Sequence, residues 1–248
     1  MNNQAINIIN NKIDNRKSYY LILDTETTNN FDNPLMYDIG GCVCDKKGKV
    51  METFSFIVYE IYVQNKDLMK IAYYFDKIPM YDNQIKEGSR KIVTLLTAKK
   101  HIDNLCNKYH IKAIIAHNMP FDYKSTNGTN RYITKSKYRY FLPYGIPIWC
   151  SLRMAQSTVC KQKSYIAWCK KYGYVTKNGR VKATAEILYR YITGDNSFVE
   201  SHTGLEDVLI EKEIFYWCMR QHKKMIKSPF RNKEISEQEK INRGWEIN

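Results

Sequence analysis

The chain has 248 residues, 44% of them apolar and 26% charged, and these ordinary globular values exclude a disordered, collagenous or fibrous protein. A total of 39 Lys and Arg residues against 25 Asp and Glu residues gives a formal net charge of +14, which favours a polyanionic partner such as nucleic acid. The bias of an AT-rich coding sequence is the alternative explanation, and charge alone does not decide between the two.

Two further features of the composition bear on where the protein works. No apolar run reaches the ~18 residues that a membrane-spanning helix needs, and residues 1–18 contain no apolar signal-peptide core. We therefore expect a cytoplasmic protein without a membrane partner. The 7 cysteines include no CxxC pair, so we expect neither disulfides nor a structural zinc site.

The first predicted elements are strands. After a polar lead-in at residues 1–18, residues 19–24 form a short apolar run that is typical of a buried central strand. Residues 37–44 and the alternating stretch 51–59 flank a polar linker that contains a glycine, which predicts a β-hairpin.

Helices and strands alternate in the next part of the chain. Residues 94–109 place apolar side chains at helical spacing, and residues 112–117 predict a further buried strand. More helices are predicted around residues 151–172 and 182–191 and from Gly204 to about residue 221. No repeat or flexible linker interrupts this order, so we expect one domain at residues 19–222, followed by a charged tail at residues 223–248.

Acidic residues stand where the first strand ends. Asp24 and Glu26 are two residues apart, and at the end of a strand such residues can point their carboxylates to the same side. Hard oxygen ligands at this spacing suit Mg²⁺ or Mn²⁺ when phosphate oxygens and water complete the octahedron. The alternative is a solvated turn that contains Asp-x-Glu by chance.

Two further acids occupy comparable places. Asp122 follows the strand at residues 112–117, where it either joins the same site or only caps a helix. Asp207 lies in the first turn of the last predicted helix, five residues after His202, where an acid can simply complement the helix dipole. Each position has its own structural explanation, but the conjunction of all of them favours a site.

These residues carry a family resemblance. Asp24-x-Glu26, Asn118-x-x-Phe121-Asp122 and His202-x-x-x-x-Asp207, in this order, resemble the three motifs of the DEDDh 3′→5′ exonucleases, a family that includes the proofreading subunit of bacterial replicative polymerases. The resemblance spans residues 19–221. It implies an α/β, ribonuclease H-like exonuclease fold, with a mixed central sheet of about five strands flanked by helices.

The resemblance also implies roles for the motif residues. Asp24, Glu26 and Asp207 would ligate one Mg²⁺ or Mn²⁺ ion, with Asp24 shared with a second ion that Asp122 holds through water. His202 would be the general base. Two divalent ions about 4 Å apart suit phosphodiester hydrolysis because they clamp the developing charge, and they relieve the repulsion among the carboxylates.

Candidate substrate contacts lie in and beside the motifs. Thr27 and Thr28 occupy the strip that the family uses for the 3′-hydroxyl, and Asn118 and Phe121 belong to the second motif. Residues 130–145 alternate basic and aromatic side chains, as a groove for single-stranded nucleic acid requires, or form a surface segment whose tyrosines pack into the domain. The candidates in this segment are Arg131, Tyr132, Lys135 and Lys137.

Three other features remain open at this stage. The basic cluster Lys177, Arg180 and Lys182 is either a solvated face or a guide for the strand. Gly204 replaces an alanine that is frequent in the family, which loosens the start of the last helix. Residues 60–89 exceed the minimal family pattern, and we expect this insertion to shape substrate access.

We therefore predict a metal-dependent 3′→5′ exonuclease that releases nucleoside 5′-monophosphates from the 3′ end of single-stranded or frayed DNA. A replication or polymerase protein is a candidate partner. A 3′→5′ exoribonuclease of the same fold and a non-catalytic DNA-binding adaptor are the alternatives, and no residue pattern in the chain distinguishes DNA from RNA.

Overall fold

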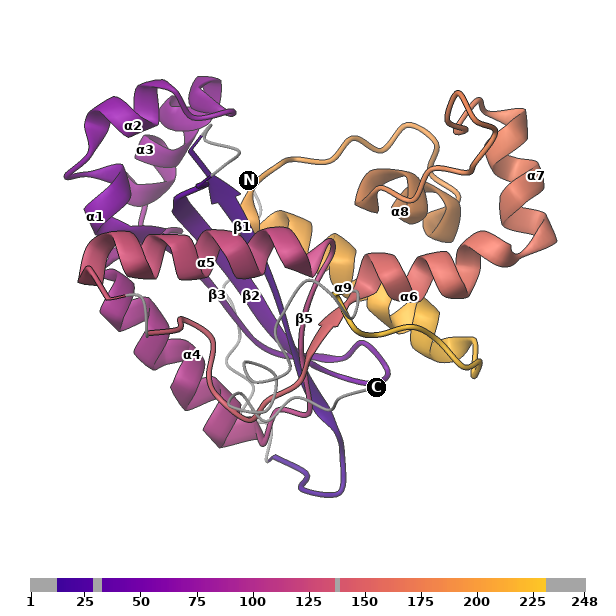
Figure 1. The fold of residues 1–248 in the computed structure, drawn as a ribbon, viewed down its shortest axis with the longest axis horizontal. Helices are drawn as coiled ribbons and strands as arrows, with labels where there is room; N and C mark the ends of the chain where they lie inside the picture. Colours follow the sequence, from indigo (N-terminus) through magenta and orange to yellow (C-terminus); the bar gives the residue numbers. More distant parts are fainter. Residues whose placement is uncertain (1–12, 29–32, 137–138, 231–248) are drawn as a thin grey trace.

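The computed structural model describes residues 13–28, 33–136 and 139–230, and these residues form a mixed six-stranded sheet with helices on both faces (Figure 1). The strand order is β4-β3-β2-β1-β5-β6, with antiparallel pairing through β1, β2 and β3 and parallel pairing of every other neighbouring pair. The strands are β1 (Tyr19–Thr27), β2 (Met36–Asp45), β3 (Val50–Val58), β4 (Lys91–Val93), β5 (Ile114–Ala116) and β6 (Ile148–Cys150).

The helices divide between the two faces of the sheet, and each face has its own apolar core. One face is covered by α4, α5 and the short helices between β3 and β4, and the other by α6 and α9, beside which α7 and α8 form a lobe (Figure 1). The helices are α1 (Tyr59–Tyr62), α2 (Lys66–Lys70), the 3-10 helix η1 (Phe75–Lys77), α3 (Ile78–Lys86), α4 (Leu95–Tyr109), α5 (Met119–Thr134), α6 (Ser151–Ser157), the 3-10 helix η2 (Val159–Lys161), α7 (Lys163–Lys171), α8 (Ala185–Thr193) and α9 (Gly204–Arg220).

Strand β1 lies between the two cores. Leu21 and Leu23 belong to the core on the α4 and α5 side, whereas Tyr20 and Ile22 belong to the core on the α9 side. Because successive strand residues point to opposite faces, burial on both faces requires a continuous apolar run. This explains why the run at residues 19–24 does not alternate with polar residues.

The strands predicted at residues 19–24, 37–44, 51–59 and 112–117 are confirmed, and β1 continues to Thr27. The sheet has one strand more than the five expected, because the three-residue edge strand β4 adds to β3. The helix predicted around residues 151–172 is divided into α6, η2 and α7. At the break, the hydroxyl of Thr158 donates to the carbonyl of Met154 at 2.7 Å, and this bond replaces a regular backbone bond.

The insertion at residues 60–89 forms a helical cap beside the end of β1. Ala72 makes an isolated antiparallel bridge to Thr28, which directly follows β1. Tyr62 and Tyr81 pack against the fully buried Tyr37 of β2 in edge-on and tilted ring contacts. The cap is therefore tied to the two central strands that carry the acidic motif and its neighbour.

Part of the predicted tail lies along the domain. The carbonyl of Lys227 accepts a bond from the amide of Cys150 at 2.9 Å, and the amide of Ile226 donates to the hydroxyl of Ser157 at 3.0 Å. Residues 1–12 and 231–248 lie outside the described residues, so the predicted lead-in and tail boundaries stay predictions. Among the helices that the structure describes, none combines the length and the hydropathy needed to cross a membrane.

Candidate active site

Three carboxylates from two distant parts of the chain converge beside β1. Asp24 and Glu26 project from β1, Asp207 projects from the first turn of α9, and one oxygen of each lies within 4.8 Å of the other two. Asp24 and Glu26 share the face of β1 that carries Tyr20 and Ile22, which is the face that α9 covers. As the sequence predicted, the carboxylates of Asp24 and Glu26 therefore point to the same side of β1.

Asp122 approaches the cluster from the opposite core and is held by the strand residue between the two acids. Thr25 donates to Asp122 Oδ1 from its backbone amide at 3.2 Å and from its hydroxyl at 2.9 Å. The N-cap residue of α5 is Asn118, four residues earlier, so the alternative that Asp122 only caps a helix is wrong. Asp122 is 2% exposed, and its orientation is fixed by β1.

Asp207 orders the loop before its own helix. Its carboxylate accepts bonds from the amide of Thr203 at 3.1 Å and from the hydroxyl of Ser201 at 3.0 Å. Thr203 occupies the N-cap position, but its side chain donates to Glu206 instead of capping the helix. His202 lies inside this loop with a φ of 52°, in the left-handed region that non-glycine residues rarely adopt.

The start of α9 is anchored on a buried acid of β2. Asp38 Oδ2 accepts bonds from the Gly204 amide at 3.0 Å, from the Tyr81 hydroxyl at 2.8 Å and from the Arg90 guanidinium at 2.9 Å. A Cβ atom added at Gly204 would lie 2.7 Å from the amide nitrogen of Gly40. β2 therefore leaves no room for a side chain at Gly204, which explains the glycine at this position.

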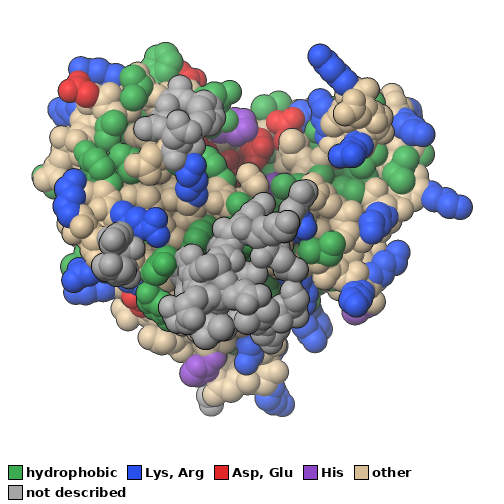
Figure 2. Space-filling view, in the orientation of Figure 1, with side chains coloured by type: hydrophobic (Ala, Val, Ile, Leu, Met, Phe, Trp, Pro, Cys, Tyr) green, Lys and Arg blue, Asp and Glu red, His purple; other side chains and the backbone are tan. Residues whose placement is uncertain are grey.

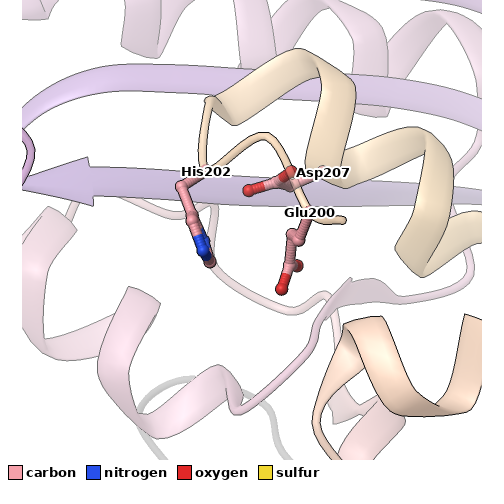
Figure 3. A group of neighbouring side chains, drawn as sticks. All are labelled: Glu200, His202 and Asp207. Carbon is pink, nitrogen blue, oxygen red and sulfur yellow. The ribbon is translucent and has the colours of Figure 1, made fainter. Parts of the chain in front are cut away.

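His202 shares a second group of potential ligands with two acids (Figure 3). One ligand atom each from Glu200, His202 and Asp207 lies within 4.8 Å of the other two, and the Glu200 and His202 side chains project from the loop toward the same space. The His202 ring stacks on Tyr74 of the insertion, with ring centroids 4.7 Å apart and an interplanar angle of 11°. The sequence predicted His202 but not its contacts with Glu200 and Tyr74.

Glu211 is a further buried acid that the sequence analysis missed. It lies one turn after Asp207 on α9, is 3% exposed, and accepts a bond from the backbone amide of His117 at 3.0 Å. Residues four apart lie on the same face of a helix. The sequence did contain a signal for Glu211, because an acid four residues after Asp207 lies on a helix face that is otherwise apolar.

The carboxylates disfavour one another's ionisation. Burial raises the pKa of Asp24 well above its ordinary value, and the neighbouring charges of Glu211 and Asp122 raise it further. Burial also raises the pKa of Asp122 to about 7, although the hydrogen bonds from Thr25 favour its ionised form. Burial raises the pKa of Asp207 to about 6, against hydrogen bonds that act in the opposite direction. Such a cluster holds its charge only when cations neutralise it.

His117 also lies beside the acids, but its ring is uncharged and both ring nitrogens are hydrogen bonded. Its Nε2 donates to the carbonyl of Ala183 at 2.9 Å, which leaves Nδ1 to accept a bond from the hydroxyl of Ser151 at 3.0 Å. Burial lowers the pKa of His117 to about 4. The ring is therefore neutral and committed to two structural bonds, and His202 is the other histidine that lines the same cavity.

The acids lie at the base of a cavity of about 780 Å³. Figure 2 shows this hollow between the sheet and the lobe that carries α7 and α8, with acidic and histidine side chains inside it. Four predicted substrate residues line it, namely Thr27, Thr28, Asn118 and Phe121. Arg180 and Lys182 of the second basic cluster line it as well, on the lobe side.

The predicted substrate residues differ in how they face the cavity. Phe121 is 36% exposed and offers an aromatic face. Thr28 is 2% exposed and is bonded to the backbone of Leu35, so its hydroxyl is already engaged. Arg131, Tyr132 and Lys135 lie at the far end of α5 and do not line the cavity, and Lys137 is outside the described residues. The role of these four stays a prediction.

The donor set suits hard divalent cations. Asp24, Glu26 and Asp207 offer only oxygen atoms, which Mg²⁺ and Mn²⁺ prefer, and Asp122 lies beside this group without belonging to it. Burial raises the pKa of Glu26 well above its ordinary value, and the charges of Asp38 and Asp207 raise it further. A buried carboxylate among other carboxylates fits a cation better than it fits a structural role.

Comparisons with known proteins identify the fold. No protein-family model matches the sequence, and no curated protein matches it. Among solved structures, cell-death related nuclease 4 (CRN-4) superposes with a TM-score of 0.52 at 13% identity, over 85% of this chain and 67% of that one. The zinc-bound complex of E. coli ExoI with single-stranded DNA gives a TM-score of 0.42 at 15% identity, over 79% of this chain and 39% of that one.

The likeness to CRN-4 and the sheet topology confirm the predicted ribonuclease H-like α/β fold. At 13% identity the likeness extends to the fold alone. The proofreading subtype and the replication or polymerase partner therefore stay predictions.

Proposed function

We propose that this protein is a metal-dependent 3′→5′ exonuclease that hydrolyses phosphodiester bonds at the 3′ end of single-stranded or frayed DNA. The convergence of Asp24, Glu26 and Asp207 at the base of an open cavity that also holds His202 carries this proposal. The names of CRN-4, a nuclease, and of ExoI, bound to single-stranded DNA, agree with it.

In the proposed mechanism, Asp24, Glu26 and Asp207 would hold one Mg²⁺ or Mn²⁺ ion, and Asp24, together with Asp122 through water, would hold a second. When bound, such ions stabilise the charge that develops on the phosphate and make the attacking water more acidic. His202 accepts the proton of that water, because its ring lines the cavity and its neutral form is favoured: burial and the charge of Lys77 lower its pKa. Thr25 keeps Asp122 oriented.

The path of the substrate follows from the walls of the cavity. Tyr73, which is 63% exposed, and Phe121 offer aromatic faces near the acids, where unstacked bases can pack. Arg180 and Lys182 on the opposite wall can bind backbone phosphates. The negative charges at the base would repel phosphates without cations, so binding of the 3′ end in its reactive position depends on the metal.

The test uses 5′-labelled DNA and RNA oligonucleotides with Mg²⁺ or EDTA, and compares the wild type with Asp24→Asn and His202→Ala. A ladder that shortens from the 3′ end, and that chelation or either substitution abolishes, would support the proposal. Shortening of RNA but not of DNA would replace it with the exoribonuclease. Binding without shortening would leave only the DNA-binding adaptor.

A further inference from the structure

The insertion at residues 60–89 contacts the loop that presents His202. Tyr74 stacks on the His202 ring in a nearly parallel arrangement. Lys77 Nζ donates to the carbonyl oxygens of Ser201 and His202, at 3.2 Å from the latter, and also lies 4.4 Å from the centroid of the Tyr74 ring. One short stretch of the insertion therefore engages both the backbone and the side chain of His202.

These contacts explain how an unfavourable backbone conformation is kept. The carbonyls of Ser201 and His202 lie on either side of the two backbone torsions of His202, so an ammonium group that binds both restrains these torsions. The φ of His202 is 52°, which a non-glycine residue adopts only when its surroundings hold it there. Stacking on Tyr74 then restrains the remaining freedom, the rotation of the imidazole ring.

Three consecutive aromatic residues of the insertion have three different environments. The Tyr74 ring lines the cavity as well, but it is engaged by His202 and Lys77. Tyr73 meets Tyr74 edge-on, is 63% exposed and lines the cavity, so it keeps a face available to a base. Phe75 is 60% exposed and does not line the cavity. Adjacent substitutions can therefore separate positioning of His202 from substrate stacking.

We infer that Tyr74 and Lys77 are positioning residues for His202, so that the insertion fixes the proton acceptor as well as bordering the substrate path. This inference rests on the proposed function, because it assigns a purpose to the orientation of the general base. The insertion would then act on the chemical step itself: removal of these contacts would slow that step and leave substrate binding intact.

Steady-state kinetics on a DNA oligonucleotide test the inference. Tyr74→Ala should lower kcat roughly 10- to 100-fold and leave KM within about twofold, as expected for a misplaced reacting group. Tyr74→Phe keeps the stacking ring and should restore kcat, and Lys77→Met should lower kcat in the same manner as Tyr74→Ala. Tyr73→Ala should instead raise KM, and Phe75→Ala should change neither constant.

A double-mutant cycle asks whether Tyr74 acts through His202. In a His202→Gln background, measured in single turnover with excess enzyme, Tyr74→Ala should cause less than about a twofold further loss, because the group that it positions is gone. A further loss as large as in the wild type would overturn the inference. So would a Tyr74→Ala enzyme whose KM rises while kcat is unchanged.

A second readout does not depend on activity. The chain has 5 histidines, so the imidazole signals of ¹⁵N-histidine-labelled protein can be assigned to His202 with the His202→Gln variant. Tyr74→Ala should broaden or shift the His202 signals and leave those of His117 unchanged, whereas Tyr74→Phe should preserve both. Unchanged His202 signals in Tyr74→Ala would overturn the inference. A wild type that does not shorten DNA would instead overturn the proposed function, and the spectra would still report whether Tyr74 holds the ring.

Discussion

Thr25 donates two hydrogen bonds to one carboxylate oxygen of Asp122, although the two residues are 97 positions apart in the chain. Thr25 stands between Asp24 and Glu26 on β1, and its side chain points to the opposite face of the sheet from theirs. One strand therefore supplies two acids to the site directly and orients a third from the other side. Because Asp24, Thr25 and Glu26 are consecutive, side chains on both faces of β1 contribute to the same group of acids.

The Thr25 hydroxyl should support metal binding through Asp122. Thr25→Val keeps the shape of the side chain but removes a hydrogen bond to a charged group, which contributes about 1.5–3 kcal/mol. Because that bond lowers the pKa of Asp122, its loss should favour the protonated acid, raise the Mg²⁺ concentration needed for half-maximal activity and lower activity roughly 10-fold or more. Thr25→Ser restores the hydroxyl and should restore the Mg²⁺ requirement. Equal Mg²⁺ curves for Thr25→Val and the wild type would contradict this role.

Glu211 should lower the stability of the metal-free protein and raise its affinity for Mg²⁺. It is buried next to other acids, and burial raises its pKa well above the ordinary value. Glu211→Gln keeps an oxygen that can accept from the His117 amide but removes the ionisable group. At pH 8 we expect the metal-free variant to melt higher than the wild type, by about 2–4 °C for each kcal/mol gained, and to bind Mg²⁺ more weakly.

Calorimetry with and without Mg²⁺ measures both effects of Glu211→Gln. Glu213→Gln is the control, because Glu213 lies on the same helix, is paired with Lys212 and has a side chain that is 36% exposed. It should change neither the melting temperature nor the Mg²⁺ affinity appreciably. A destabilised Glu211→Gln protein with unaltered metal binding would show that Glu211 serves the fold alone.

The acids could be predicted because short local patterns place them. Asp24 and Glu26 follow an apolar strand, and Asp207 follows a loop at the start of an apolar-periodic helix, so each position is encoded within about ten residues. The contact between Tyr74 and His202 has no such local pattern, since it joins two irregular segments. The edge strand β4 escaped prediction because three residues, the first two of them exposed, carry no recognisable period.

The position of the basic and aromatic strip after Asn130 could not be predicted from residue types, and its role stays a prediction. The residue types suited nucleic acid, but their placement depends on an element that residue types do not reveal. Arg131 lies nine residues after Asp122 on the continuous helix α5, and a helix rises 1.5 Å per residue, which carries it about 13 Å from the acid. Arg180 and Lys182 belong to a less conspicuous cluster, yet the chain folds them onto the wall of the cavity.

Arg180 and Lys182 should bind the backbone of the substrate. Between residues 158 and 199 the chain carries eight Lys and Arg residues and two acids, and Figure 2 shows blue side chains over this lobe. Replacement of Arg180 and Lys182 by Ala should raise KM for single-stranded DNA and reduce the slope of log affinity against log salt by about 0.7 for each phosphate that the variant no longer binds. Lys170→Ala with Lys171→Ala, on the same lobe but outside the cavity, should leave KM and the slope nearly unchanged.

Gly40 should set the distance between Asp24 and Asp207. It pairs with Asp24 across the β1 and β2 ladder, and a Cβ atom added to it would lie 2.2 Å from the backbone carbon of Gly204 on α9. Gly40→Ala must therefore push α9 away from β1. We expect a loss of about 1–3 kcal/mol of stability or more, together with a weaker Mg²⁺ affinity.

Gly128→Ala is the matched control for Gly40→Ala. Gly128 lies in α5, and its added Cβ would meet only the side-chain oxygen of Asn33 at 3.1 Å and the carbonyl of Pro34 at 3.4 Å. Thermal melts and Mg²⁺ titrations should show a small effect for Gly128→Ala. If Gly40→Ala melted lower but bound Mg²⁺ with wild-type affinity, the close approach of β2 and α9 would matter for folding and not for the geometry of the acids.

Stability should depend on pH and on metal in a linked way. A carboxyl whose pKa is higher in the folded than in the unfolded state binds more protons when folded, so its contribution is present at low pH and is lost as pH rises through the folded pKa. Burial raises the pKa of Asp122 and Glu200 to about 7, so the metal-free protein should lose stability as the pH rises from about 4, the ordinary carboxyl pKa, to about 7. His117, whose pKa is lowered to about 4, acts in the opposite direction between about pH 4 and 6.5, and as one group it offsets only part of the loss from the two carboxyls.

Mg²⁺ should reverse this loss, because it binds the ionised carboxylates. Thermal melts in EDTA should therefore show a falling Tm from about pH 5 to 7, whereas melts in Mg²⁺ should show a flat or rising one, so that the gain from metal grows with pH over this range. Asp24→Asn should reduce that gain at every pH, since it removes a proposed ligand of both ions. A gain from Mg²⁺ that is the same at about pH 5 and pH 7, and that Asp24→Asn leaves unchanged, would place the cation elsewhere on the protein and remove the main support for a metal-dependent nuclease.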